Sequence, residues 1–266
     1  MTKNLPTETT ISALLLEVLN TADAVAKANH ARTVFREISA QNLPFGAEPA
    51  PDRPARPAKP ELVPPNKMPR RGTGGLKGRQ GLLHALAHIE LNAIDLAADI
   101  IIRFGADLPA AFTTDWLSVL DDEARHFLIL EKRLNELECS YGALAAHDGL
   151  WQAAYDTRHD LGARLAIVPL VHEARGLDVT PPTVERLETH GDAASAALLT
   201  IIYNDEITHV KIGMRWLNHY CAAQQIDIAR FFQKQVAQHM RGGLKPPFND
   251  EARALADFPA TLYAPD

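Results

Sequence analysis

The sequence contains the same short pattern of acidic and histidine residues twice. Residues 122–126 read Asp-Glu-Ala-Arg-His, and residues 205–209 read Asp-Glu-Ile-Thr-His. On a helix, side chains three residues apart lie on one face, so the glutamate and histidine of each copy can bind one metal ion. Both copies lie within long helical patterns, at positions where an apolar residue is expected, and a buried carboxylate needs a cation or a partner. The repeated pattern therefore predicts a metal site inside a bundle of helices.

Two further glutamates, Glu90 and Glu173, lie on the apolar faces of other predicted helices. Glu90 precedes Glu123 by 33 residues, and Glu173 precedes Glu206 by the same 33 residues. A single glutamate of this kind is more often a surface or salt-bridged residue, but the matched spacing favours two equivalent helical hairpins. Four glutamates and two histidines form the ligand set of ferritin-like di-iron and di-manganese proteins. The predicted ligands are Glu90, Glu123, His126, Glu173, Glu206 and His209.

Four other side chains lie near these ligands in the sequence. We interpret His84, His88 and His172 as packed histidines or as residues that support the ligands. Tyr203 precedes Glu206 by three residues, so it faces the same way and can touch the site. The alternative is a core tyrosine whose hydroxyl bonds elsewhere.

Apolar residues recur with the 3.6-residue period of a helix along most of the chain, and no stretch alternates as a strand would. The predicted fold class is all-α: a ferritin-like four-helix bundle with additional N- and C-terminal helices and a proline-rich arm. We expect residues 1–75 to form the N-terminal helix and the arm, packing on the bundle. Residues 76–222 form the bundle, and residues 223–266 form the C-terminal helix and tail. The predicted helices cover residues 10–39, 77–104, 109–138, 157–175, 192–220 and 227–240, with shorter ones near Leu150 and over residues 181–190.

The proline-rich arm, residues 43–71, holds nine of the chain's 18 prolines. Proline has no N–H and a fixed φ, so the arm cannot be a helix or a central strand. One interpretation is an extended strap or linker. The other is that the arm lies over the bundle and lines a substrate entrance.

The third helix of the bundle is predicted to be broken between Gly176 and Pro182. Glycine and a Pro-Pro pair interrupt the helical pattern there, shortly after Glu173. One half of the helix would end near Gly176, and the other would run from Pro181 to His190. We hypothesise that this break borders the channel to the metals; the alternative is a simple loop between helices.

Composition narrows the class of protein. The formal charge of −6 shows no basic excess of the kind that marks a nucleic-acid-binding domain. Only two cysteines occur, which excludes a thiolate metal site and suits a reducing compartment. Glu17 interrupts the only apolar run near the N-terminus, and no apolar stretch reaches the length of a membrane span. We therefore expect a cytoplasmic protein that does not enter a membrane.

Several stretches resemble one known family. They are residues 83–96, 173–181 and 205–210, together with Pro246-Pro247-Phe248-Asn249. They look like the ferritin-like family labelled domain of unknown function 455, and the resemblance extends over nearly the whole chain. It implies the fold and the metal site but supplies no established reaction.

The ligand arrangement also resembles the wider class of di-iron oxidases and hydroxylases, which includes a tRNA-modifying hydroxylase. In that class, the aspartate before each Glu-x-x-His pair often holds the histidine of the opposite helix. The resemblance implies that Asp122 orients His209 and that Asp205 orients His126. Such partners fix the histidine tautomer and raise its basicity.

Carboxylate and imidazole ligands without thiolate suit iron or manganese. The resemblance to the di-iron class implies two iron ions, with a manganese–iron pair left open, and dioxygen as co-substrate. The first interpretation is a non-haem di-iron oxidoreductase, an oxidase or hydroxylase of an unidentified organic substrate, either a small molecule or a modified nucleoside. A ferroxidase, iron-storage or peroxide-removing protein is the second, and a metal-stabilised interaction module without turnover is the third. A homo-oligomer is compatible with each.

Overall fold

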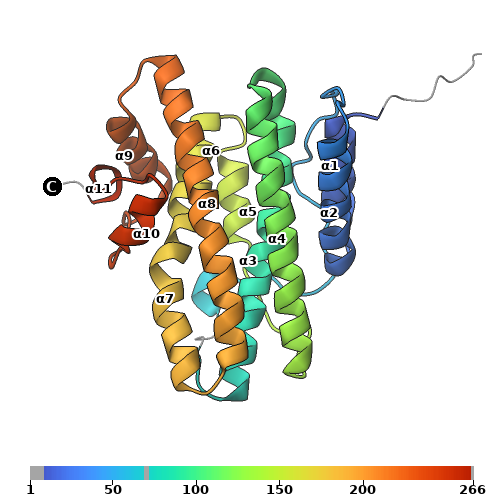
Figure 1. The fold of residues 1–266 in the computed structure, drawn as a ribbon, viewed down its shortest axis with the longest axis vertical. Coiled ribbons are helices and arrows are strands. Elements are labelled where there is room, and N and C mark those ends of the chain that lie inside the picture. Colours follow the sequence, from blue (N-terminus) through green and yellow to red (C-terminus); the bar gives the residue numbers. More distant parts are fainter. Residues whose placement is uncertain (1–8, 69–71, 265–266) are drawn as a thin grey trace, which may run out of the picture. The chain divides into compact units, whose positions relative to one another are not determined.

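The structure is a computed structural model that describes residues 9–68 and 72–264, so the predicted arm residues 69–71 lie outside the described part. The described chain is helical, and its only bridge between extended segments joins Leu62 to Ala146 (Figure 1). The all-α class is therefore confirmed. The elements are α1 (Ile11–Asn20), α2 (Ala24–Ala40), η1 (Pro65–Lys67), α3 (Gly75–Phe104), η2 (Gly105–Asp107), α4 (Ala110–Glu136), α5 (Gly149–Asp156), α6 (Leu161–Ile167), η3 (Val168–Glu173), α7 (Ala174–Thr189), α8 (Ala193–Gln224), α9 (Ile228–His239), α10 (Asp250–Leu255) and α11 (Ala260–Tyr263).

The chain divides into two compact units. The first unit comprises Met1–Lys59 and Glu90–Leu128, and the second comprises Pro60–Ile89 and Ile129–Asp266. Helices α3 and α4 each contribute residues to both units. The division into residues 1–75, 76–222 and 223–266 remains a prediction.

The N-terminal helical segment of the first unit is two helices, α1 and α2, which pack side by side (Figure 1). The single helix predicted over residues 10–39 is wrong at this point. Helix α1 ends at Asn20, and α2 begins at Ala24. Asp23 starts α2 because its side chain accepts a hydrogen bond of 2.8 Å from the backbone N–H of Ala26.

The arm packs on the first unit through buried charges. Lys27 of α2 is fully buried, and its Nζ lies 2.5 Å from Oδ1 of Asp95 in α3. The same ammonium donates a hydrogen bond of 2.9 Å to the carbonyl of Ala55 in the arm. Arg56, the next arm residue, lies 3.0 Å from Oδ2 of Asp95. Residues 55 and 56 of the arm are thereby tied to α2 and α3.

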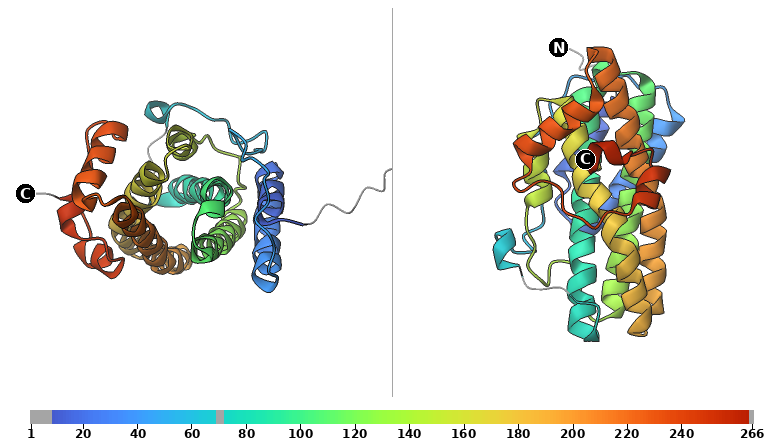
Figure 2. Two further views of the ribbon diagram at one scale, coloured as in Figure 1. Left: turned by 90° about the horizontal axis from the view of Figure 1, so that it is seen from above. Right: turned by 90° about the vertical axis from the view of Figure 1, so that its left-hand side faces the viewer.

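Helix α8 is the longest element of the second unit. It contacts α6, η3 and α7, and the C-terminal helices α9 and α10 also pack on it (Figure 2). Helix α8 begins directly after Asp192, as predicted. The side chain of Asp192 caps it by accepting a hydrogen bond of 3.1 Å from the backbone N–H of Ser195. The short helix predicted near Leu150 is α5.

The expected break between Gly176 and Pro182 does not occur. Helix α7 runs continuously from Ala174 to Thr189 with Pro181 and Pro182 inside it. Proline at position 181 removes the N–H that would bond to the carbonyl of Leu177. That carbonyl instead accepts a hydrogen bond of 3.1 Å from the side-chain amide of Asn249. A residue about seventy positions away in the sequence thus satisfies the backbone of α7.

The irregularity of the third helix lies one turn earlier, at η3. Residues Val168–Glu173 form a π-helical segment that joins α6 to α7 and contains Pro169. Gly213 of α8 allows η3 to pack close, because a Cβ at this glycine would lie 2.7 Å from Cβ of Pro169. π-Helical turns within α-helices are rare and are frequent at functional sites.

The C-terminal region has more helix than predicted. The helix expected over residues 227–240 is α9, and two further short helices, α10 and α11, follow it. Asn249 starts α10 by accepting a hydrogen bond of 3.1 Å from the N–H of Ala252. No helix in the described part of the chain combines the length and hydropathy that crossing a membrane requires.

Candidate metal centre

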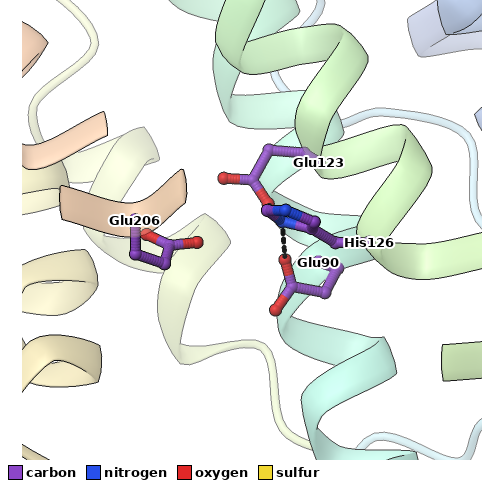
Figure 3. A group of neighbouring side chains, drawn as sticks. All are labelled: Glu90, Glu123, His126 and Glu206. Carbon is purple, nitrogen blue, oxygen red and sulfur yellow. Dashed lines mark ion pairs between the residues drawn. The ribbon is translucent and has the colours of Figure 1, made fainter. Parts of the chain in front are cut away.

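Glu90, Glu123 and His126 come together in the first unit. Glu90 lies on α3, and the other two lie one turn apart on α4. Nδ1 of His126 is 3.3 Å from Oε2 of Glu90 and 3.6 Å from Oε2 of Glu123. Figure 3 shows the two carboxylates directed toward the imidazole, with the Glu90–His126 ion pair dashed. Three of the predicted ligands therefore share one point of the fold.

These three side chains are almost completely removed from water. Their residues expose 3% for Glu90, 1% for Glu123 and none for His126. Burial raises the pKa of Glu90 well above its usual value, and the negative charge of Glu123 raises it further, although a hydrogen bond with His126 opposes the shift. Two carboxyl groups this close cannot both be ionised at low cost without a positive charge between them.

The donor atoms fit a metal ion. One ligand atom from each of Glu90, Glu123 and His126 lies within 4.8 Å of the others, so this buried group could hold a cation. The donors are carboxylate oxygen and imidazole nitrogen, as predicted. A divalent cation would stabilise the ionised form of these buried carboxyl groups.

Helix α8 of the second unit carries the matching pair, Glu206 and His209. Oε1 of Glu206 lies 3.6 Å from Nδ1 of His209, the same separation as between Glu123 and His126. The side chain of His209 is 1% exposed, and that of Glu206 is 13% exposed. Both Glu-x-x-His pairs therefore present a carboxylate oxygen and Nδ1 of a buried imidazole side by side.

Glu173 is the last residue of η3, which packs on α8 within the second unit. The predicted ligand therefore lies at the junction between the π-helical segment and α7. The helical pattern instead predicts a regular α-helix that contains Glu173 and ends at Gly176.

The aspartates that precede the two pairs are partly exposed. Oδ1 of Asp122 accepts a hydrogen bond of 2.9 Å from Nη2 of Arg125, its neighbour on α4. The pairings of Asp122 with His209 and of Asp205 with His126 stay predictions. Tyr203 is 3.2 Å from the side-chain amide of Asn249, which donates to its hydroxyl oxygen.

The three additional histidines all have places in the second unit. His84 accepts a hydrogen bond of 2.9 Å from the N–H of Gly142, and Nδ1 of His88 is 2.8 Å from the hydroxyl of Tyr141. Both imidazoles of α3 thus hydrogen-bond to residues 141 and 142, in the segment that follows α4. Burial, and secondarily the charge of His147, lower the pKa of His172.

A cavity of about 260 Å³ in the second unit involves residues that sequence reasoning missed. Its lining includes His147, Arg175 and Met68, besides the expected His88 and His172. Met68 belongs to the arm, so the arm contributes to the lining of this cavity; that it lines a substrate entrance stays a prediction. A nearby part of the arm is held by a hydrogen bond of 2.8 Å from Val63 N–H to the carbonyl of Ala146. Only the proximity of Arg175 to Glu173 in the sequence could have indicated that it lines this cavity.

Comparison with known proteins gives a family match and one relative. The family described as "Protein of unknown function (DUF455)" matches residues 20–264. An uncharacterized protein of Haemophilus influenzae (strain ATCC 51907 / DSM 11121 / KW20 / Rd) is 39% identical over 210 residues, which cover 77% of this chain and 73% of the relative. No solved structure matches the chain.

Proposed function

Since this chain belongs to the DUF455 family, whose function is unknown, we propose a function from its own residues: it is a di-iron carboxylate protein that oxidises or hydroxylates an organic substrate with dioxygen. The proposed fold is a ferritin-like bundle of α3, α4, α8 and the helix formed by α6, η3 and α7. The observation that carries the proposal is the recurrence of one geometry. The Glu-x-x-His pairs of α4 and α8 both place carboxylate oxygen and imidazole Nδ1 3.6 Å apart.

The proposed site joins two half-sites of equal composition. Glu90, Glu123 and His126 form one half-site, and Glu206, also labelled in Figure 3, would form the other with Glu173 and His209. The equal 33-residue spacing within each pair of helices supports this assembly. Six ligands shared by two ions leave coordination positions open for a substrate.

Iron is the metal that we assign to this donor set. Oxygen and imidazole donors without thiolate suit iron or manganese, and both cysteines, Cys139 and Cys221, lie outside the ligand set. The bound metals would supply the redox chemistry. The chain's own residues hold the ions by their carboxylates and exclude water from the buried half-site. Metal binding would require each imidazole to be deprotonated at Nδ1, the nitrogen that faces the carboxylates.

Metal analysis and oxygen uptake test this function. We expect the purified chain, loaded anaerobically with ferrous iron, to bind two iron ions per chain and then to consume oxygen. Manganese offered together with iron will show which pair the site selects. The proposed oxidase keeps two metals per chain, whereas an iron-storage protein accumulates many more. A chain that binds neither metal would contradict the proposal.

The aspartates before the ligand pairs give a second prediction. Replacing Asp122 by alanine should weaken metal binding about 10–100-fold, because a histidine that loses its outer partner is less basic and less well oriented. The matched control is Asp121→Ala, since Asp121 precedes it on α4 and instead pairs with Arg32 at 3.0 Å. Metal affinity is measured by competition with a chelator. Equal affinities in the two variants would show that Asp122 has another role.

A further inference from the structure

Two cavities of the second unit share two lining residues, His172 and Arg175. The first, of about 260 Å³, is mainly apolar, and Met68, Ala85 and Ile89 are among its lining residues. The second, of about 270 Å³, lies against the segment between α9 and α10. His172 directly precedes the proposed ligand Glu173, so both cavities adjoin the chain segment that carries this one ligand.

The second cavity is lined by an excess of positive charge. Its charged lining residues are Arg175, Arg241, Lys245 and Arg253, against a single acid, Asp178. The chain as a whole has a formal charge of −6, so this concentration of cations is local. It favours a ligand that carries negative charge.

The one acid of this cavity is already neutralised. Arg253 binds Asp178 through two hydrogen bonds, Nε to Oδ1 at 2.9 Å and Nη2 to Oδ2 at 2.7 Å. Arg253 is 3% exposed, and its buried Nη1 has no hydrogen-bond partner within the described residues. Asp178 also pairs with Arg175, so four cations share one carboxylate and the lining keeps an excess of three positive charges.

The guanidinium of Arg175 is held in place by hydrogen bonds from one of its nitrogens, Nη1. Its Nη1 donates to the carbonyl of Lys245 at 2.9 Å, to that of Pro247 at 3.0 Å, and to Asp178 at 3.2 Å. All its hydrogen bonds among residues 9–68 and 72–264 use Nη1, which leaves Nη2 and Nε available. A guanidinium fixed in this way suits an oxyanion, which accepts parallel N–H bonds.

We propose that the second cavity binds the oxyanion group, a carboxylate or a phosphate, of the organic substrate whose apolar part occupies the first cavity. This assignment rests on the proposed function, because it makes the occupant a substrate of the metal site. Arg175 bridges the two parts of the substrate, and Arg241 and Lys245 supply further positive charge at the solvent side. The two cavities together have the size of a small-molecule site, roughly 300–1,000 Å³.

Binding of small aromatic probes to the metal-loaded protein tests the proposal. The probes are phenyl phosphate, benzoate and uncharged benzyl alcohol, each titrated by calorimetry. We expect at least one anion to bind about tenfold more tightly than the alcohol, because charge-assisted hydrogen bonds are the stronger kind. The anion that binds more tightly identifies the substrate's charged group as phosphate or carboxylate.

A pair of double variants locates the binding. Arg241→Gln with Lys245→Gln should weaken anion binding about tenfold and leave the alcohol unaffected, since two cations are lost. The control is Arg230→Gln with Lys234→Gln on α9, which removes the same charge from exposed residues outside both cavities. It should change the affinity less than about twofold, because distant exposed charges are screened.

The outcomes separate this inference from the proposed function. Equal affinity for charged and neutral probes, equal weakening by both double variants, or no anion binding would overturn it. Iron content is measured on the same samples. If the unmodified protein holds no metal but binds the anion, and only the Arg241→Gln/Lys245→Gln variant loses this binding, the oxyanion site is supported. The proposed function would then be wrong, because the bound anion could not be the substrate of a metal centre.

Discussion

Replacing Glu123 by alanine is expected to reduce metal affinity by more than about 100-fold, the upper range for residues that only support a ligand. Glu123 is 1% exposed and lies beside both Glu90 and His126, so no water-exposed group can replace its carboxylate. Oxygen uptake by the iron-loaded protein should fall with the metal content. Iron per chain and oxygen consumption are the two measurements.

The control for this variant is Glu136→Ala at the end of the same helix. Glu136 is exposed and pairs with Arg133 at 2.9 Å, away from the predicted ligands. This control should keep both metals and the full rate of oxygen uptake. Circular dichroism will show whether each variant stays folded. A folded Glu123→Ala protein that retains two iron ions and normal uptake would remove Glu123 from the site.

Replacing Asp95 by alanine should lower the free energy of unfolding by about 3–5 kcal/mol. Asp95 is fully buried and neutralises Lys27, which is also fully buried, and Arg56 of the arm. Burial lowers the pKa of Lys27 and raises that of Asp95, so each charge depends on the other for its stability. Removing the carboxylate leaves the ammonium without its counter-charge. Urea unfolding at neutral pH measures the change.

A double variant distinguishes the effect of an unpaired buried charge from the effect of losing the Lys27–Asp95 ion pair itself. Lys27→Met combined with Asp95→Leu replaces both buried charges by apolar groups, which is often nearly neutral for stability. Arg56 is 20% exposed and can turn toward solvent. The double variant should therefore be more stable than Asp95→Ala alone. If Asp95→Ala unfolds at the same urea concentration as the unmodified protein, the buried pair contributes nothing to stability.

The long helices and one half of the candidate site could be predicted from local patterns. The apolar period placed α3, α4 and α8 within a few residues of their ends, and Asp192 marked the start of α8. The Glu-x-x-His spacing identified side chains that the structure does place together. These successes depend on interactions within one or two helical turns, which the sequence displays directly.

The errors arose where distant residues decide the backbone. Gly176 and the prolines at 181 and 182 indicated a broken helix, but Asn249 supplies the missing hydrogen bond to the carbonyl of Leu177. The end of α1 has no strong stop signal, although Asp23 is an ordinary start signal for α2. The close contact of Gly213 with Pro169, and with it the π-helical segment, depends on packing that no local pattern reveals. Cavity residues such as Arg175 were missed for the same reason.

The π-helical segment η3 makes the orientation of Glu173 depend on the local type of helix. A π-helical turn holds one residue more than an α-helical turn, so it behaves as a local insertion. A substitution that changed Val168–Glu173 to regular α-helix would keep the number of residues but remove the wider turn. The carboxylate of Glu173 would then turn by about 100° relative to α6. Such a substitution could thus move a proposed ligand to another face of its helix while every ligand residue stayed in the sequence.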